Sequence, residues 1–252
     1  PFHVTQFFDG DKSGERCSAA AAYLHPVMGR PNLRIVTRAM AERVLVEEGR
    51  AIGVRFRRRG QVIEARALRE VILSAGAFGS PQLLLLSGIG PEEEFSAHGI
   101  APVHVLPGVG RNLQDHLDYI IGYHSRRSDV VGLGPAGLMR LAKAGLEWRR
   151  TGAGHFASPM AEAGAFFRSG PEVDRPDLQM HFVIGIVDTH LRRLHLRDGF
   201  SAHVCVLRPH SRGHVGLTSA DPAAAPRIDP GFLSDPRDLP VLMRGARIME
   251  QV

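Results

Sequence analysis

The stretch EVILSAGAFGSPQLLLLSGIG, residues 70–90, decides the fold prediction. Its first five residues form an apolar run that is typical of a strand buried in a parallel sheet. A turn of small residues follows, and Ser80 and Pro81 are typical of the N-cap and first position of a helix. Small residues let a ligand approach the backbone, and a helix N-terminus favours a negatively charged group. The stretch predicts a strand–turn–helix unit that contacts such a ligand, or else a plain structural βα unit.

The sequence on either side of this stretch predicts further short elements. Ser18 is a plausible N-cap for an alanine-rich helix over residues 18–24. Glu48-Gly49-Arg50 lies between two strand-like runs and predicts a β-hairpin. The other elements expected between residues 33 and 106 are strands at 33–36, 43–47, 51–56, 61–65 and 103–106 and a short helix at 91–98.

After residue 116 the pattern changes to strand-like runs that alternate with loops. This pattern is typical of a mainly antiparallel sheet with flanking helices. The predicted fold class is therefore α+β (mixed α/β). The expected strands are residues 119–124, 161–167, 178–186, 200–208 and 214–218, and the expected helices are residues 136–150 and a helix that opens within 235–252.

The composition narrows the class of protein. The 252 residues include 44% hydrophobic and 23% charged residues, with a net charge of +5, which is ordinary for a globular protein. The excess arginines are scattered and not interleaved with aromatic residues, so no nucleic-acid partner is predicted. A weak attraction to anionic membrane surfaces remains open. Cys17 and Cys205 lie far apart without metal-ligand spacing, which fits a reducing, cytoplasmic compartment.

Several blocks, in order along the chain, resemble the glucose–methanol–choline (GMC) oxidoreductase family, in particular its choline dehydrogenase-like and aliphatic alcohol dehydrogenase-like members. Residues 70–90 resemble the family's second signature. The other blocks are residues 2–6, 15–24, 30–33, 53–54, 108–116, 175–179, 208–213, 228–230 and 233–236.

This resemblance implies part of a three-layer FAD-binding domain and a substrate domain with a mainly antiparallel sheet. Residues 1–13 would be an edge or linker of the substrate domain, and residues 14–106 the partial FAD-binding domain. Residues 107–235 would form the substrate domain, and residues 236–252 would begin a helix. The chain begins at Pro1 and ends within a helical pattern, so it is expected to be an internal fragment.

The resemblance also implies site residues. Ala41 matches a residue whose main chain contacts the FAD adenine, and Ala75 and Gly76 match a turn near the cofactor's ribose and diphosphate. Glu162 matches a glutamate that faces the substrate in choline-oxidising members, although a structural hydrogen-bonding role is the alternative. No catalytic residue is expected within the chain, because the family's histidine base would follow Val252. The FAD diphosphate fingerprint would precede Pro1.

Two other patterns suggest chemistry. Residues 132–137 satisfy the G-x-G-x-x-G pattern, but no strand leads into them and no acidic residue follows at the required distance, so a nucleotide site is not predicted. Six histidines are dense in one region but lack metal-ligand spacing, so no metal is predicted. They are His181, His190, His195, His203, His210 and His214.

The expected function follows from the resemblance. The parent protein would oxidise a primary alcohol, choline or an aliphatic alcohol, to an aldehyde by hydride transfer to FAD, and this chain alone would be inactive. A non-catalytic binding or scaffold module is the alternative, and a nicotinamide-dependent dehydrogenase is a third. The small-molecule alcohol, the oligomeric state and the electron acceptor, whether oxygen or a quinone-linked chain at the inner membrane face, are not readable from the sequence.

Overall fold

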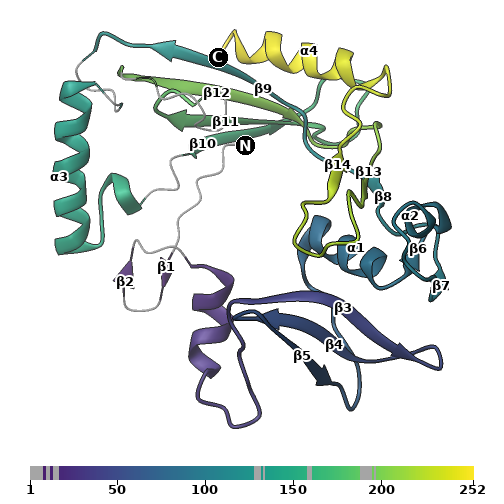
Figure 1. Cartoon of the computed structure of the whole chain (residues 1–252). Helices are drawn as coiled ribbons and strands as arrows, with labels where there is room; N and C mark the ends of the chain where they lie inside the picture. Colours follow the sequence, from purple (N-terminus) through teal and green to yellow (C-terminus); the bar gives the residue numbers. More distant parts are fainter. Residues whose placement is uncertain are drawn as a thin grey trace. The chain divides into compact units, whose positions relative to one another are not determined.

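The computed structural model describes residues 8–9, 12–13, 17–127, 132, 134–157, 161–187, 195 and 197–252 (Figure 1). The chain forms two compact units. The first contains Pro1–Leu33, His116–Pro209 and Pro236–Val252, and the second contains Arg34–Asp115 and His210–Asp235. Residues 210–235 thus group with 34–115, so the units are not continuous stretches of sequence.

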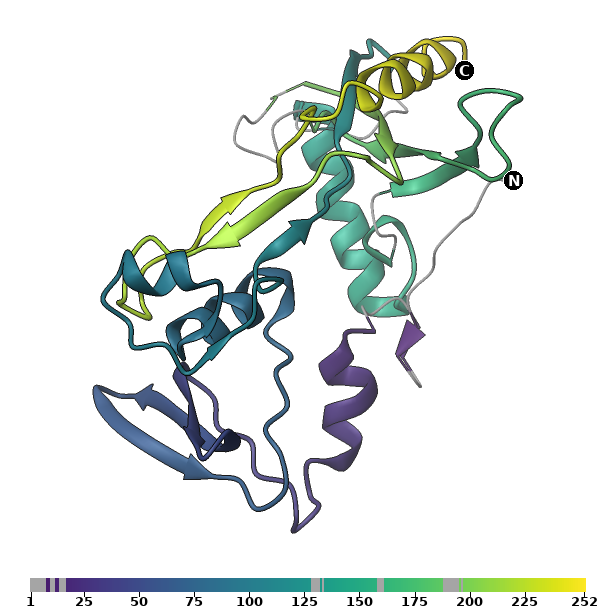
Figure 2. The same cartoon turned by 90° about the vertical axis from the view of Figure 1, so that its right-hand side faces the viewer.

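The first unit is built on a four-stranded antiparallel sheet with the order β10-β11-β12-β9. Its strands are β9 (Asp118–His124), β10 (Ala161–Phe167), β11 (Leu178–Ile184) and β12 (Gly199–Val206). Helix α4 (Asp238–Met249) lies alongside this sheet in both views (Figures 1 and 2). These elements confirm the predicted antiparallel sheet and the helix near the end of the chain.

Side chains alternate between the two faces of this sheet, because successive residues of a strand point in opposite directions. The helix-covered face carries the apolar core of the unit, in which Leu178 and Val204 are fully buried. Leu242 and Met249 of α4 belong to the same core. The opposite face is more polar, and the register places His181 of β11 directly opposite His203 of β12.

The remaining elements of the first unit are mostly helical. Helix α3 (Pro135–Thr151) confirms the helix predicted over 136–150, and it ends at Gly152 with φ +70°, a conformation that glycine adopts readily. The alanine-rich segment near Ser18 forms a π-helix, η1, rather than an ordinary α-helix. The other short elements are η1 (Ala20–Leu24), η2 (His25–Val27), η3 (His155–Ala157), β1 (Phe8–Asp9) and β2 (Lys12–Ser13).

The second unit begins with a three-stranded meander of β3 (Ala39–Glu47), β4 (Arg50–Arg58) and β5 (Gln61–Arg66). The hairpin predicted at Glu48-Gly49-Arg50 is confirmed, and Glu47 pairs with Arg50. Glu48 and Gly49 form its two-residue turn, and both have the positive φ that such a turn requires. Arg–Glu ion pairs cross the strands of this meander, with N–O distances of 2.9 Å for Arg55–Glu64, 2.7 Å for Arg57–Glu42 and 2.8 Å for Arg66–Glu47.

The rest of the second unit packs around helix α1. The core contains Leu85, Leu86, Phe95, Ile100, Val109 and Leu217. Buried Glu94 is satisfied by the Leu217 N–H at 3.0 Å and by Arg227 at 2.7 Å. The elements are α1 (Gly76–Leu86), α2 (Glu92–Ser96), β6 (Ile89–Gly90), β7 (His104–Val105), β8 (Arg111–Leu113), β13 (Gly213–Gly216) and β14 (Arg227–Asp229).

The predicted strands at residues 33–36 and 70–74 are wrong for this structure. Neither segment forms a strand in the described part of the chain, and the Ile72 side chain is 75% exposed. The apolar pattern of residues 70–74 is typical of a buried strand, but a strand also requires a neighbour to complete its hydrogen bonds. No described strand supplies that neighbour.

The predicted start of helix α1 at Ser80 is also wrong, because the helix begins at Gly76 and contains Pro81. The Ser80 hydroxyl accepts a hydrogen bond from the Ala75 N–H at 3.0 Å, so Ser80 stabilises the turn without being the N-cap. Pro81 lacks the donor that would otherwise reach the carbonyl of Ala77. Ala77 is exposed, so solvent can satisfy that carbonyl.

Two further findings concern the whole described chain. Cys17 is exposed and Cys205 is buried, and neither forms a disulfide bond within the described residues. Among the residues that the structure describes, no helix is both long and apolar enough to span a membrane.

Candidate functional site

The turn at the start of α1 exposes its backbone. Ala75 and Gly76 are both exposed, and Gly76 has φ +77°. A Cβ built on Gly76 would meet nothing within 4 Å, so the space beside the turn is open. The main chain of this turn is therefore exposed, and its contact with a ligand stays a prediction.

Ala41 lies on a different element of the same unit. It is an exposed residue of β3, which is an edge strand of the meander, and the strand register shifts between Ala41 and Arg43. An edge strand leaves main-chain N–H and C=O groups without partners in the sheet. Helix α1 is tied to the same strand, because the Val44 N–H donates to the Ser87 hydroxyl at 2.8 Å.

These two places fit a ligand that is recognised through the main chain. Both are exposed, and the N-terminus of α1 carries the partial positive charge of a helix dipole. Neither place adds a charged side chain of its own. The geometry is therefore suited to part of a large anionic cofactor, with the remaining contacts supplied by other groups.

Glu162 lies on β10, at the point where the register with β11 shifts between Ala161 and Ala163. Its side chain lies outside the described residues. The predicted role of Glu162 toward substrate therefore stays a prediction.

The sheet of the first unit brings together three polar residues that the sequence did not connect. Asp118 of β9 accepts a hydrogen bond from Nδ1 of His203 at 2.8 Å, across a sequence separation of 85 residues. The His203 side chain is only 11% exposed. Among the described residues, Asp118 Oδ1 and His203 Nε2 are buried without a hydrogen-bond partner. His181 of β11 lies opposite His203, so Asp118, His203 and His181 form a polar row across β9, β12 and β11. Gly164 of β10 lies opposite His181.

His181 is the histidine of this row whose titration is shifted. Burial lowers its pKa, the nearby Asp118 carboxylate opposes this effect, and the neighbouring His203 and His116 lower it further. A lowered pKa keeps the imidazole neutral near pH 7. A neutral ring has one donor and one acceptor nitrogen, so His181 is able to accept a hydrogen bond.

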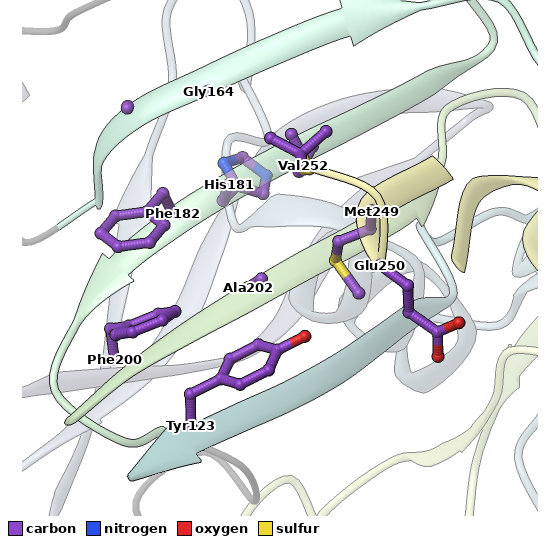
Figure 3. Close-up of a pocket in the computed structure, with 11 residues that line it drawn as sticks. Tyr123, Gly164, His181, Phe182, Phe200, Ala202, Met249, Glu250 and Val252 are labelled. Carbon is purple, nitrogen blue, oxygen red and sulfur yellow. The ribbon is translucent and has the colours of Figure 1, made fainter. Parts of the chain in front are cut away.

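A cavity of about 450 Å³ lies on the helix-covered side of the same sheet, near the end of α4 (Figure 3). Phe200 stacks against both Tyr123 and Phe182, with ring centroids 5.0 Å apart in each pair. Met249 and Glu250 border the cavity from the helix end. The wall is mostly apolar, with a carboxylate at one side.

The G-x-G-x-x-G segment has a structural explanation. The Gly134 N–H donates to the Asp198 carboxylate at 3.1 Å, at the N-terminus of α3. A Cβ on Gly137 would lie 2.5 Å from an Asp198 oxygen. The glycines therefore make room for Asp198, whose negative charge occupies the helix end where a phosphate would bind.

The described residues include no group of three or more His, Cys, Asp and Glu side chains arranged to hold a metal ion. His190 lies outside the described residues. His214 approaches Asp229 at 4.0 Å, in the second unit.

Comparisons with known proteins agree on one family. Two family models described as GMC oxidoreductase match residues 3–118 and 209–252. Alcohol dehydrogenase [acceptor] of Pseudomonas putida is 43% identical over 98% of this chain and 44% of its own length. Mitochondrial choline dehydrogenase of Mus musculus is 39% identical over 95% of this chain and 40% of its own length.

A solved structure shows the same fold. Formate oxidase of Aspergillus oryzae RIB40, studied for its FAD modification, superposes with a TM-score of 0.76 at 26% identity. The match covers 88% of this chain and 44% of that one. The chain thus spans less than half the length of the proteins that it resembles.

Proposed function

The chain belongs to the GMC oxidoreductase family, and we propose that it is part of an FAD-dependent enzyme that oxidises a primary alcohol to an aldehyde. The observation that carries this proposal is the 43% identity with an alcohol dehydrogenase over 98% of the chain. The mixed α/β fold, which matches a solved family structure along most of its length, supports it.

The proposed cofactor contacts are main-chain contacts. Ala41 on the edge strand would contact the adenine, and Ala75 and Gly76 would contact the ribose and diphosphate at the N-terminus of α1. The exposure of all three residues supports this assignment. When bound, FAD supplies the acceptor for the hydride of the alcohol.

The proposed substrate is choline or an aliphatic alcohol. Glu162 on β10 is the residue that would distinguish them, because a carboxylate attracts a cationic substrate and has no such attraction for a neutral alcohol. Relatives named as choline dehydrogenases and as an alcohol dehydrogenase both resemble the chain at about the same level. A substrate panel is therefore the direct way to choose.

The first test is enzymatic. The full-length protein that contains this chain is expected to be isolated with FAD and to reduce an artificial electron acceptor in the presence of a primary alcohol. The panel should include choline, ethanol and medium-chain alcohols, each with oxygen and with a quinone analogue as acceptor. The 252-residue chain alone is expected to be inactive, since it spans 44% of its alcohol dehydrogenase relative.

The outcomes separate the alternatives. Retention of stoichiometric FAD and alcohol turnover by the isolated chain would contradict its proposed inactivity. A full-length protein that neither binds FAD nor oxidises any alcohol would support a non-catalytic binding module. Rates that depend on a nicotinamide cofactor would favour the dehydrogenase alternative.

A second test concerns Gly76. In the full-length protein, Gly76→Val is expected to weaken FAD binding about 5- to 30-fold, because a side chain at φ +77° adds about 1–2 kcal/mol of strain to the cofactor-binding turn. Titration of the apoprotein with FAD, followed by flavin fluorescence, measures this change.

Gly49→Val is the matched control for Gly76→Val. Gly49 has φ +76° and, like Gly76, open space around its Cβ position, but it lies in the β3–β4 turn. The control should cost similar stability and leave FAD affinity unchanged. Equal loss of affinity in the two variants would remove Gly76 from the cofactor site.

A further inference from the structure

The polar row on the sheet of the first unit contains a buried acceptor without a partner. The Nδ1–H of His203 donates to Asp118 at 2.8 Å, so its Nε2 carries a lone pair when the ring is neutral. This Nε2 is buried and unpaired among the described residues. A buried acceptor without a hydrogen bond is costly, so a donor is expected close to it.

His181 is the nearest candidate donor by register. It lies directly opposite His203 in the β11–β12 pair, and side chains opposite each other have Cβ atoms about 4.5–5.5 Å apart. β10 offers no competing side chain at this point, because Gly164 is the residue opposite His181. A Cβ at position 164 would also lie 2.9 Å from the Met180 carbonyl, so the register disfavours a side chain there.

We propose that Asp118, His203 and His181 form a hydrogen-bonded relay in which His203 Nε2 accepts an N–H from His181. Asp118 fixes the tautomer of His203, and His203 in turn fixes the tautomer of His181. Asp118 and His203 are then positioning residues for His181. The second ring nitrogen of His181 remains an acceptor for a ligand that presents a hydroxyl group, and this ligand class rests on the proposed function.

The charges around His181 are consistent with a neutral ring. Burial lowers its pKa, His203 and His116 act in the same direction, and Asp118 acts against them. His116 precedes β9 and makes an interaction of its own. Cys205, the neighbour of Asp118 across the β9–β12 pair, is buried on the same face and also makes an interaction of its own.

The test reads tautomers directly by two-bond ¹H–¹⁵N correlation spectra of the full-length protein labelled with [¹⁵N]histidine, without substrate. At pH about 8, above the ordinary histidine pKa of about 6.5, the neutral forms are observed. Wild-type His203 is expected as the Nδ1–H tautomer, and His181 as a single tautomer. His203 protonated on Nε2 in the wild type would overturn the relay, whatever the variants do.

The decisive variant is Asp118→Asn. An amide can donate as well as accept, so His203 loses its fixed tautomer, and His181 is expected to change from one tautomer to a mixture of both. Asp118 makes no hydrogen bond to His181 in this relay, although its charge acts on His181 directly. The His203→Asn variant keeps that charge, so a His181 tautomer that changes in Asp118→Asn but not in His203→Asn also overturns the relay. An unchanged His181 spectrum in Asp118→Asn overturns the proposal.

A second variant removes only the proposed hydrogen bond between His181 and His203. In His203→Asn the side-chain amide can still donate to Asp118, but the Nε2 acceptor is gone, so His181 is again expected as a mixture. Amide signals of buried Leu178 and Val204 report whether the sheet remains folded. His98, which contacts the Leu217 carbonyl at 3.2 Å in the second unit, should be unchanged.

The relay and the proposed function fail separately. If the tautomers follow the expectations but the full-length protein oxidises no alcohol, the relay stands and the hydroxyl ligand class is withdrawn. If alcohol is oxidised but the tautomers do not respond, His181 acts without Asp118 and His203.

Discussion

Phe95→Ala is expected to lower the free energy of unfolding of the second unit by about 3–5 kcal/mol, the range for truncating a buried phenylalanine. Phe95 is 1% exposed, and it joins α2 to the core formed by Leu85, Leu86 and Val109. The loss combines the transfer energy of the ring with the cavity that it leaves. The change within this unit is measured by amide hydrogen exchange of the α1 and β13 residues at increasing urea concentrations.

Phe78→Ala is the matched control, because Phe78 lies on α1 but is 45% exposed. It should cost much less than Phe95→Ala, since most of its removed surface already contacts solvent. The role of Phe95 matters for the proposed function because its core positions α1, whose first turn is the candidate cofactor contact. Similar losses in the two variants would contradict the described core.

Leu178→Ala is expected to lower the free energy of unfolding of the first unit by about 2–5 kcal/mol. Leu178 is fully buried, and α4 contributes Leu242 and Met249 to the same core. The tight packing around it is evident from Gly245, where an added Cβ would lie 3.0 Å from a methyl group of Leu178. Hydrogen exchange of the β11 and β12 amides reports the change.

Leu146→Ala provides the control for this unit, because Leu146 is 58% exposed on α3. A change within about 0.5 kcal/mol is expected for such a surface site, apart from a small gain in helix propensity. If Leu178→Ala were as mild as Leu146→Ala, α4 would not depend on the sheet core as described.

The sequence predicted elements well wherever local pattern and final environment agree. The strand-like run over residues 161–167 predicted β10 with its observed bounds, and the helix expected over 136–150 is α3. The prediction failed at residues 70–74, where the apolar pattern is typical of a buried strand but no described strand pairs with the segment. Whether a segment pairs in a sheet depends on a partner strand elsewhere in the chain, so it cannot be predicted from the segment's own residues.

The candidate site was less predictable. The exposed turn at Ala75 and Gly76 follows from small residues before a helix, but the Asp118–His203 bond joins residues 85 positions apart. Only the order β10-β11-β12-β9 places Asp118, His203 and His181 in one row. Spacing rules that search for ligands on one helix do not detect such a row, because it crosses three strands.

The three ion pairs on the β3–β5 meander have a consequence for aggregation. β3 and β5 are both edge strands, and Val62 on β5 is 50% exposed, so the meander could serve as a template for strands of other molecules. Fixed charges along such an edge hinder the stacking of identical copies, because like charges would then lie side by side. Exposed pairs such as Arg55–Glu64 and Arg66–Glu47 stabilise a fold by only about 0–1 kcal/mol each, so we expect their loss to affect association between molecules more than the stability of the meander.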